Sequence, residues 1–78
     1  MKVEVKLFAG LRDYVPRSKL GPMLLDVPHG HTVGDILISF GIPEDIQKII
    51  FINGIHGTDE TPLKDNDRVG VFPPIAGG

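Results

Sequence analysis

Polar and apolar residues alternate at the start of the chain, which predicts a strand with one buried face. Val3, Val5 and Leu7 point to one side, and the charged residues between them point to the other. A second short strand is predicted over residues 23–27, where a proline and a glycine follow. We expect the two strands to pair as a hairpin.

The spacing of apolar residues then changes to that of a helix. The positions that form one apolar helix face are Val33, Ile36, Leu37 and Phe40. Thr32 is a favourable N-cap residue, and Asp35 can support the first turn three positions later. Gly41 is expected just past the end of the helix, whereas Gly34 weakens its interior. Residues 43–47 are expected to form one short helical turn.

The second half of the chain predicts a hairpin and a final strand. Residues 49–52 are an unbroken apolar run, which is typical of a strand inside a sheet. Asn53-Gly54 is the strongest hairpin signal in the chain and predicts a type I′ turn into a short return strand. Residues 68–72 predict the last strand, which stops because the two prolines that follow cannot donate to a sheet.

This order of elements predicts the fold class. Strand, strand, helix, strand, short strand and strand indicate an α+β protein of the β-grasp (ubiquitin-like) type, a mixed four- to five-stranded sheet with one main helix on one face. The first and last strands are expected to be parallel neighbours at its centre. We expect residues 1–72 to form the β-grasp domain and residues 73–78 to form a flexible C-terminal tail that ends in Gly77-Gly78.

Composition excludes several kinds of chemistry. The 78 residues suffice for one small domain, and the absence of cysteine removes disulfides, iron–sulfur clusters and thiol catalysis. Eight basic and ten acidic residues are interspersed, so no footprint for nucleic acid is expected. No segment approaches the roughly 18 apolar residues of a membrane span, and the charged start differs from a signal peptide. No membrane partner and a cytoplasmic location are therefore expected.

Polar residues inside the domain suggest no active site of its own. His29, His31 and His56 are scattered, and no bound metal or cofactor is expected. The acidic residues at 59–60 and 65–67 are interpreted as solvated turns. Neither a Ser-His-Asp arrangement nor a phosphate-binding loop is present. We therefore expect the domain to have no independent active site, so that it could take part in catalysis only as a subunit of a larger enzyme.

The C-terminal carboxylate of Gly78 is the most promising reactive group. It is ionised at neutral pH and can attack the α-phosphate of ATP to give an acyl-adenylate. Two terminal glycines let such a tail enter a narrow active site, because no Cβ blocks the approach of another backbone. A glycine pair can also arise by chance, so the preceding residues must decide.

An aromatic patch is expected at the root of the tail. Phe8 closes the first strand and Phe72 the last, and parallel neighbours end at the same edge of a sheet. By parity with the charged residues, both lie on the open face, away from the helix. Phe51 or Ile50 of the adjoining strand can join them. An exposed apolar patch indicates a docking surface; the alternative is that the loop at 16–22 covers it.

Several segments resemble the MoaD/ThiS family of ubiquitin-like sulfur carriers, with the ending closest to the MoaD branch. They are residues 5–13, 27–37, 51–54, 61–69 and 71–78. The resemblance covers nearly the whole chain. Its most specific part is the ending Phe-Pro-Pro-x-Ala-Gly-Gly, which is typical of MoaD, the small subunit of molybdopterin synthase.

The resemblance implies a function in molybdenum or tungsten cofactor biosynthesis. An adenylyltransferase of the MoeB/ThiF type, similar to ubiquitin-activating enzymes, would use ATP to adenylate Gly78, which is then converted to a thiocarboxylate. The tail would enter the large, MoaE-type subunit of molybdopterin synthase and give sulfur to a cyclic pterin precursor. The residues expected to contact partners are Phe8, Phe51, Phe72, Pro73, Pro74, Ile75, Ala76 and Gly77.

Three other functions stay open. The short segment at 42–48 is more similar to thiamine-pathway carriers of the ThiS type than to many molybdenum-pathway members. A ubiquitin-like modifier would instead be joined through Gly78 to lysines of other proteins. A regulatory β-grasp module that binds RNA or a ligand is disfavoured by the low basic content and the Gly-Gly ending.

Overall fold

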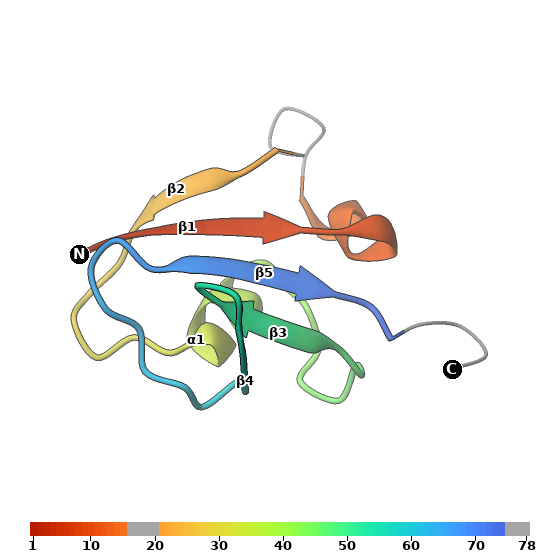
Figure 1. Cartoon of the computed structure of the whole chain (residues 1–78). Helices are drawn as coiled ribbons and strands as arrows, with labels where there is room; N and C mark the ends of the chain where they lie inside the picture. Colours follow the sequence, from red (N-terminus) through yellow and green to blue (C-terminus); the bar gives the residue numbers. More distant parts are fainter. Residues whose placement is uncertain (16–20, 75–78) are drawn as a thin grey trace.

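Residues 1–15 and 21–74 are described by a computed structural model of the chain (Figure 1). Their elements are β1 (Lys2–Leu7), the 3-10 helix η1 (Ala9–Tyr14), β2 (Met23–Asp26), α1 (Val33–Ser39), β3 (Ile49–Ile52), β4 (Ile55–Gly57) and β5 (Arg68–Phe72). The strands form a five-stranded sheet in the order β2-β1-β5-β3-β4. β1 and β5 are parallel, and every other neighbouring pair is antiparallel. The predicted β-grasp fold is confirmed.

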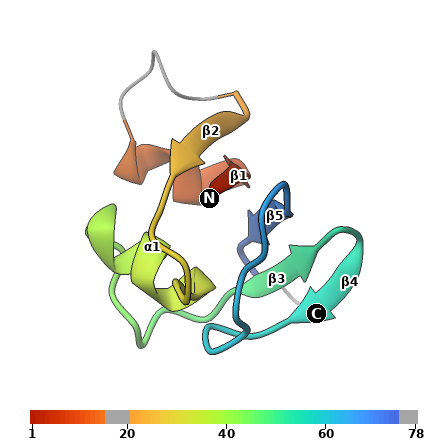
Figure 2. The same cartoon turned by 90° about the vertical axis from the view of Figure 1, so that its left-hand side faces the viewer.

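The helix α1 lies on one side of the sheet (Figure 2). The apolar face of α1 packs against the inward side chains of β1 and β5 to form the core. The core residues are Val33, Ile36 and Leu37 of α1, Val3, Val5 and Leu7 of β1, and Val69 and Val71 of β5. Thr32 and Asp35 form a capping box, in which Asp35 N donates to Thr32 Oγ1 at 3.2 Å and Thr32 N donates to Asp35 Oδ2 at 3.0 Å. Gly41 follows the helix at φ +82°. The predicted start and end of the helix are confirmed.

Gly34 weakens the helix intrinsically, but its site has no room for a side chain. Its N–H donates to the carbonyl oxygen of Asp59 at 2.8 Å. A Cβ at this position would lie 3.1 Å from that same oxygen. Glycine therefore allows the first turn of α1 to approach the loop after β4.

Asn53 and Gly54 form the predicted hairpin turn, with φ +53° and +81° as a type I′ turn requires. Asn53 Nδ2 donates to Asp67 Oδ1 at 2.9 Å, and Arg68 N donates to Asn53 Oδ1 at 3.0 Å. Asp67 is buried and also accepts from Lys64 N at 2.7 Å. The interpretation of Asp67 as part of a solvated turn is wrong, because its carboxylate fastens the hairpin to the start of β5.

Two connections contain local turns. Residues 9–14 form η1, in which Leu11 is buried. Residues 43–47 form a hydrogen-bonded turn instead of a helical one. The turn is closed by Ile46 N, which donates to the carbonyl oxygen of Pro43 at 3.3 Å, and Lys48 Nζ donates to the carbonyl oxygens of Glu44 and Ile46.

The last strand ends where the sequence predicts, since β5 stops at Phe72 and is followed by the two prolines. The assignment of residues 73–78 as a separate tail stays a prediction, because residues 75–78 lie outside the described part of the chain. Within residues 1–15 and 21–74, no helix has the length and apolar character needed to cross a membrane.

Candidate functional site

Phe8, Phe51 and Phe72 meet beside the end of β5 and are called the aromatic cluster below. The rings of Phe8 and Phe72 are stacked, with centroids 4.1 Å apart and planes 11° from parallel. The ring of Phe51 meets Phe72 edge-on, at 5.9 Å and 86°. Aromatic pairs in such arrangements add roughly 0.5–1.5 kcal/mol beyond the area that they bury.

The strand register brings these three rings together. Phe8 N donates to the carbonyl oxygen of Val71 at 3.0 Å, which extends the parallel pairing of β1 and β5 to their ends. Phe8 and Phe72 therefore leave the sheet at the same edge, as predicted from strand order. On the other side of β5, the antiparallel strand β3 places Phe51 opposite Gly70.

The aromatic cluster lies on the face of the sheet that α1 does not cover. A Cβ on Gly70 would point at the rings of Phe72 and Phe8, whereas its neighbours Val69 and Val71 point into the core. Ile50 is buried in the same core, so Phe51 and not Ile50 joins the cluster. The predicted placement of the phenylalanines on the open face is confirmed.

The alternative that the loop at 16–22 covers the phenylalanines is not tested, because residues 16–20 lie outside the described chain. Phe51 remains 36% exposed among the described residues. The outward position of its ring leaves apolar surface available for contact.

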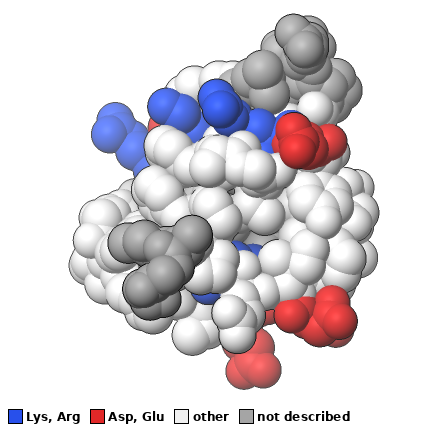
Figure 3. Space-filling model, turned by 90° about the vertical axis from the view of Figure 1, so that its right-hand side faces the viewer, with Lys and Arg blue, Asp and Glu red and all other residues white. Residues whose placement is uncertain are grey.

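An apolar groove of about 490 Å³ borders the aromatic cluster. Its lining residues are Phe8, Ala9, Ile49, Phe51, Phe72, Pro73 and Pro74. Figure 3 shows this end of the molecule as a largely uncharged surface, with basic side chains to one side and acidic side chains to the other. Pro73 and Pro74, which follow β5 directly, thus form part of the groove wall. Ile75, Ala76, Gly77 and Gly78 lie outside the described residues.

Lys6 adds a positive charge to the aromatic cluster. Its Nζ lies 4.8 Å from the centroid of the Phe8 ring, within the range of a cation–π interaction. The strand pattern placed Lys6 on the open face. It could not show that the side chain would bend back over the ring, because that contact depends on the rotamers of both residues.

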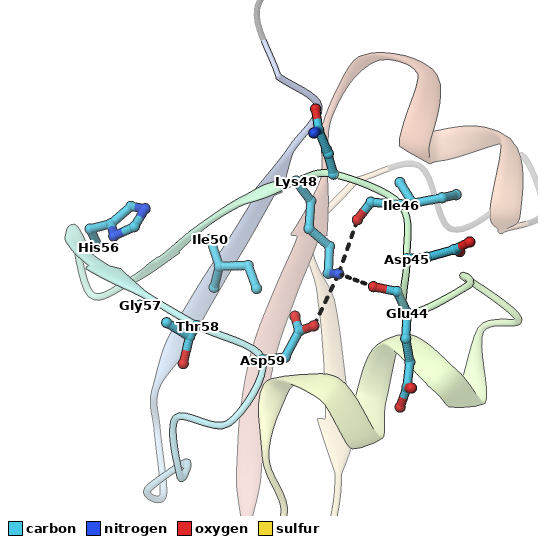
Figure 4. Close-up of a pocket in the computed structure, with 10 residues that line it drawn as sticks. Glu44, Asp45, Ile46, Lys48, Ile50, His56, Gly57, Thr58 and Asp59 are labelled. Atoms are coloured by element: carbon cyan, nitrogen blue, oxygen red, sulfur yellow. Dashed lines mark hydrogen bonds and ion pairs between the residues drawn. The ribbon is translucent and has the colours of Figure 1, made fainter.

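A second hollow, of about 410 Å³, lies between residues 43–48 and the loop after β4 (Figure 4). The Lys48 side chain is only 6% exposed, and its Nζ lies 3.1 Å from Asp59 Oδ2. The same Nζ donates to the carbonyl oxygens of Ile46 and Glu44 at 3.2 and 3.4 Å. These contacts engage all three donors of the ammonium group, so Lys48 joins the two loops and has no donor left for a ligand.

The position of Asp59 corrects a second interpretation of the acidic loops. Its carboxylate is not a solvated turn group, because one oxygen pairs with Lys48 and the other is buried without a hydrogen-bond partner in the described part of the chain. Sequence spacing gave no signal for this pair, since the two residues belong to different loops.

The other titratable groups in the described part of the chain form no cluster that could do chemistry. Hydrogen bonding to the backbone and side chain of Thr32, with a smaller effect of nearby His31, lowers the pKa of Asp35. This is the expected effect of a helix cap on an exposed carboxyl group. Among residues 1–15 and 21–74, no three His, Asp or Glu side chains are grouped closely enough to hold a metal ion.

Within the described residues, the sheet order, the α-helix on one face and the end of β5 at Phe72 define a ubiquitin-like domain. In a comparison with protein-family models, residues 5–78 match the ThiS family. The chain belongs to this family, and the predicted MoaD/ThiS membership is confirmed. No curated protein matched the chain in a sequence search.

Solved structures of similar fold include a Pyrococcus furiosus protein assigned as subunit 1 of molybdopterin converting factor, at 28% identity and a TM-score of 0.70, covering 96% of this chain and 99% of that one. Small archaeal modifier protein 1 from Methanosarcina acetivorans is also 28% identical, with a TM-score of 0.67 and coverages of 99% and 96%.

A third similar chain comes from a protein–protein complex of subunits 1 and 2 of molybdopterin-converting factor from Helicobacter pylori. It is 23% identical, with a TM-score of 0.61 and full coverage of both chains. At that identity the likeness supports the fold alone.

Proposed function

We propose that this protein is a sulfur carrier, that Gly78 is its reactive residue, and that it serves as the small subunit of a molybdopterin synthase. The observation that carries the proposal is that the match to the ThiS family extends to Gly78 itself. The apolar groove beside Pro73 and Pro74 supports it, because it offers a contact surface where the chain leaves the domain.

The proposed chemistry needs only the C-terminal carboxylate from this chain. An oxygen of Gly78 attacks the α-phosphorus of ATP, and pyrophosphate leaves. A sulfide equivalent then attacks the acyl carbon, AMP leaves, and the product is a thiocarboxylate. The ATP site belongs to the partner adenylyltransferase, so this domain itself binds no cofactor. We propose a cytoplasmic location, where the partner adenylyltransferase would have ATP available.

Partner enzymes would supply the catalytic groups, and the domain would supply position. The aromatic cluster and the groove would dock first an adenylyltransferase of the MoeB/ThiF type and then a large subunit of the MoaE type. Holding a nucleophilic thiocarboxylate on a tethered tail raises its effective concentration at the acceptor. The likeness to the Pyrococcus furiosus protein assigned as subunit 1 of molybdopterin converting factor, at 28% identity over nearly the whole chain, supports a subunit role of this kind.

Mass spectrometry of the intact protein tests sulfur loading. With the adenylyltransferase, ATP and a sulfur source, the mass should rise by about 16 Da, since sulfur replaces one oxygen. Deletion of Gly78 should abolish the gain. If the wild-type chain shows no gain, or if the deletion variant still transfers sulfur, the proposal is wrong.

The acceptor distinguishes the molybdopterin pathway from the thiamine pathway. The loaded protein should lose sulfur when a MoaE-type subunit and the cyclic pterin precursor are added. Loss of sulfur only with a thiazole synthase would instead assign the protein to the thiamine pathway. The observation that favours the thiamine pathway is the short connection between α1 and β3, which is more similar to that of ThiS-type carriers.

A second candidate function is protein modification. It is favoured by the likeness to small archaeal modifier protein 1, at 28% identity over nearly the whole chain. Immunoblots of cells expressing a tagged chain would then show higher-mass conjugates that require Gly78. Sulfur transfer without such conjugates supports the carrier function over this one.

A further inference from the structure

Gly70 occupies the middle of β5, directly below the aromatic cluster. It is paired with Lys6 of β1 on one side and with Phe51 of β3 on the other. A Cβ at this position would lie 3.2 Å from Cε1 of Phe72 and 3.5 Å from Cε1 of Phe8. The first distance is shorter than normal carbon–carbon contact, so a side chain here would push at least one ring away.

The backbone gives no reason for glycine at this position. Gly70 is not among the residues with positive φ in the described chain, and it lies in regular strand pairing on both sides. Glycine in a strand interior is destabilising, since it loses more backbone freedom and packs no side chain. The space that it leaves is instead filled by the edges of two aromatic rings.

The rings that rest on Gly70 also order the rest of the patch. Phe8 and Phe72 are nearly parallel at 4.1 Å, Phe51 meets Phe72 edge-on, and Lys6 Nζ lies over Phe8. A shallow groove of about 340 Å³ runs over Gly70 between these side chains. Raising the stack by even part of an ångström would change the shape of this groove and its contacts with Phe51.

We propose that Gly70 is a positioning residue for partner binding. Its missing side chain lets the Phe8–Phe72 stack lie against the sheet and so preforms the surface that partners contact. This inference rests on the proposed function, because it assumes that the aromatic cluster is the docking surface. A preformed surface binds more tightly, because its side chains lose less conformational entropy on association.

Gly70→Ala is the direct test, with Gly21→Ala as the matched control, because a Cβ on Gly21 would meet nothing within 4 Å. Affinity for the adenylyltransferase should fall about tenfold or more in Gly70→Ala, as at an interface hot spot. The thermal midpoint should stay near the wild-type value, and Gly21→Ala should change neither quantity. Wild-type affinity in Gly70→Ala would overturn the inference.

A double-mutant cycle keeps the test informative if Gly70→Ala is less stable. In a Phe72→Ala background, the ring that a Cβ would strike is absent, so Gly70→Ala should cost no further affinity. Additive losses would show that the substitution acts elsewhere and would overturn the inference.

Nuclear magnetic resonance gives a readout that does not depend on the partner. In the wild-type protein, ring currents should displace the α-proton resonances of Gly70 and the side-chain resonances of Lys6. In Gly70→Ala the Lys6 resonances should move toward their unshifted positions. If the wild-type resonances show no displacement, the stack does not lie on Gly70 and the inference fails. If they are displaced but no partner binds, the proposed function fails instead.

Discussion

Two hollows of similar size, the apolar groove at the aromatic cluster and the hollow at Lys48, differ in how their lining groups are used. In the hollow at Lys48, the charged side chain is nearly buried and all its donors have partners within the chain. In the apolar groove, aromatic and proline side chains contact one another but keep surface that faces outward. The hollow at Lys48 therefore holds two loops together, whereas the apolar groove keeps surface that a partner can contact.

This difference separates stability from function in a very small domain. A chain of this size has few residues to spare for its core, and yet three of its four phenylalanines lie outside the core. Substitutions at the apolar groove should therefore lower partner affinity, and substitutions at the hollow at Lys48 should lower the stability of the fold.

The largest effect is expected for Phe72→Ala, because this ring contacts both other members of the aromatic cluster. Affinity for the MoaE-type subunit should fall by about 2 kcal/mol, or roughly 30-fold, as for a central interface residue. Phe51→Ala should have a smaller effect of the same kind. Isothermal titration calorimetry measures both affinities. Affinity unchanged by Phe72→Ala would show that partners dock elsewhere.

Lys48→Ala should affect stability without affecting affinity. It leaves the Asp59 carboxylate without its cation, and because Asp59 is partly exposed we expect a loss of about 2 kcal/mol in the free energy of unfolding, less than for a fully buried pair. Urea unfolding measures this loss. Lys64→Ala, at an exposed lysine, is the control.

A double variant sharpens the result for Lys48. Lys48→Met combined with Asp59→Asn should be more stable than the sum of the single losses predicts, because neither residue then leaves an unpaired charge. If Lys48→Ala instead abolishes partner binding in a protein that is still folded, the hollow at Lys48 is a second contact site and the comparison fails.

The smallest effect is expected at the capping box. The pKa of Asp35 is lowered in the folded protein, so its contribution to stability is present above the unfolded-state pKa of about 3.9 and is lost as pH falls through the folded-state value. Asp35→Asn should therefore lower stability slightly at pH 7 and converge with the wild type in acid. Carbon-13 titration of Asp35 and urea unfolding at several pH values measure this. A constant difference down to acid pH would contradict the prediction.

Local sequence signals predicted most of the fold and the three phenylalanines of the candidate site. Thr32 with Asp35 fixes a helix start, and Asn53-Gly54 fixes a turn, because each acts through its own neighbours in the chain. The parity of Phe8 and Phe72 was sufficient to place them on the open face once the two end strands were paired. These predictions depend only on spacing and on strand order.

Contacts between distant loops could not be predicted in this way. Asp59 and Asp67 were both interpreted as solvated, but each meets its partner only after the chain has folded: Lys48 in one case and Asn53 in the other. The role of Gly70 was missed for a similar reason, since its significance lies in rings that approach from β1 and from the end of β5. No spacing rule along the chain reports such contacts.

The parallel pairing of β1 with β5 also has a consequence for biosynthesis of the protein. The centre of the sheet is made from strands at opposite ends of the sequence, so its core cannot close before β5 has left the ribosome. Long-range pairing of this kind slows folding. Only a chain translated through its last strand can therefore complete the sheet from which the C-terminus departs.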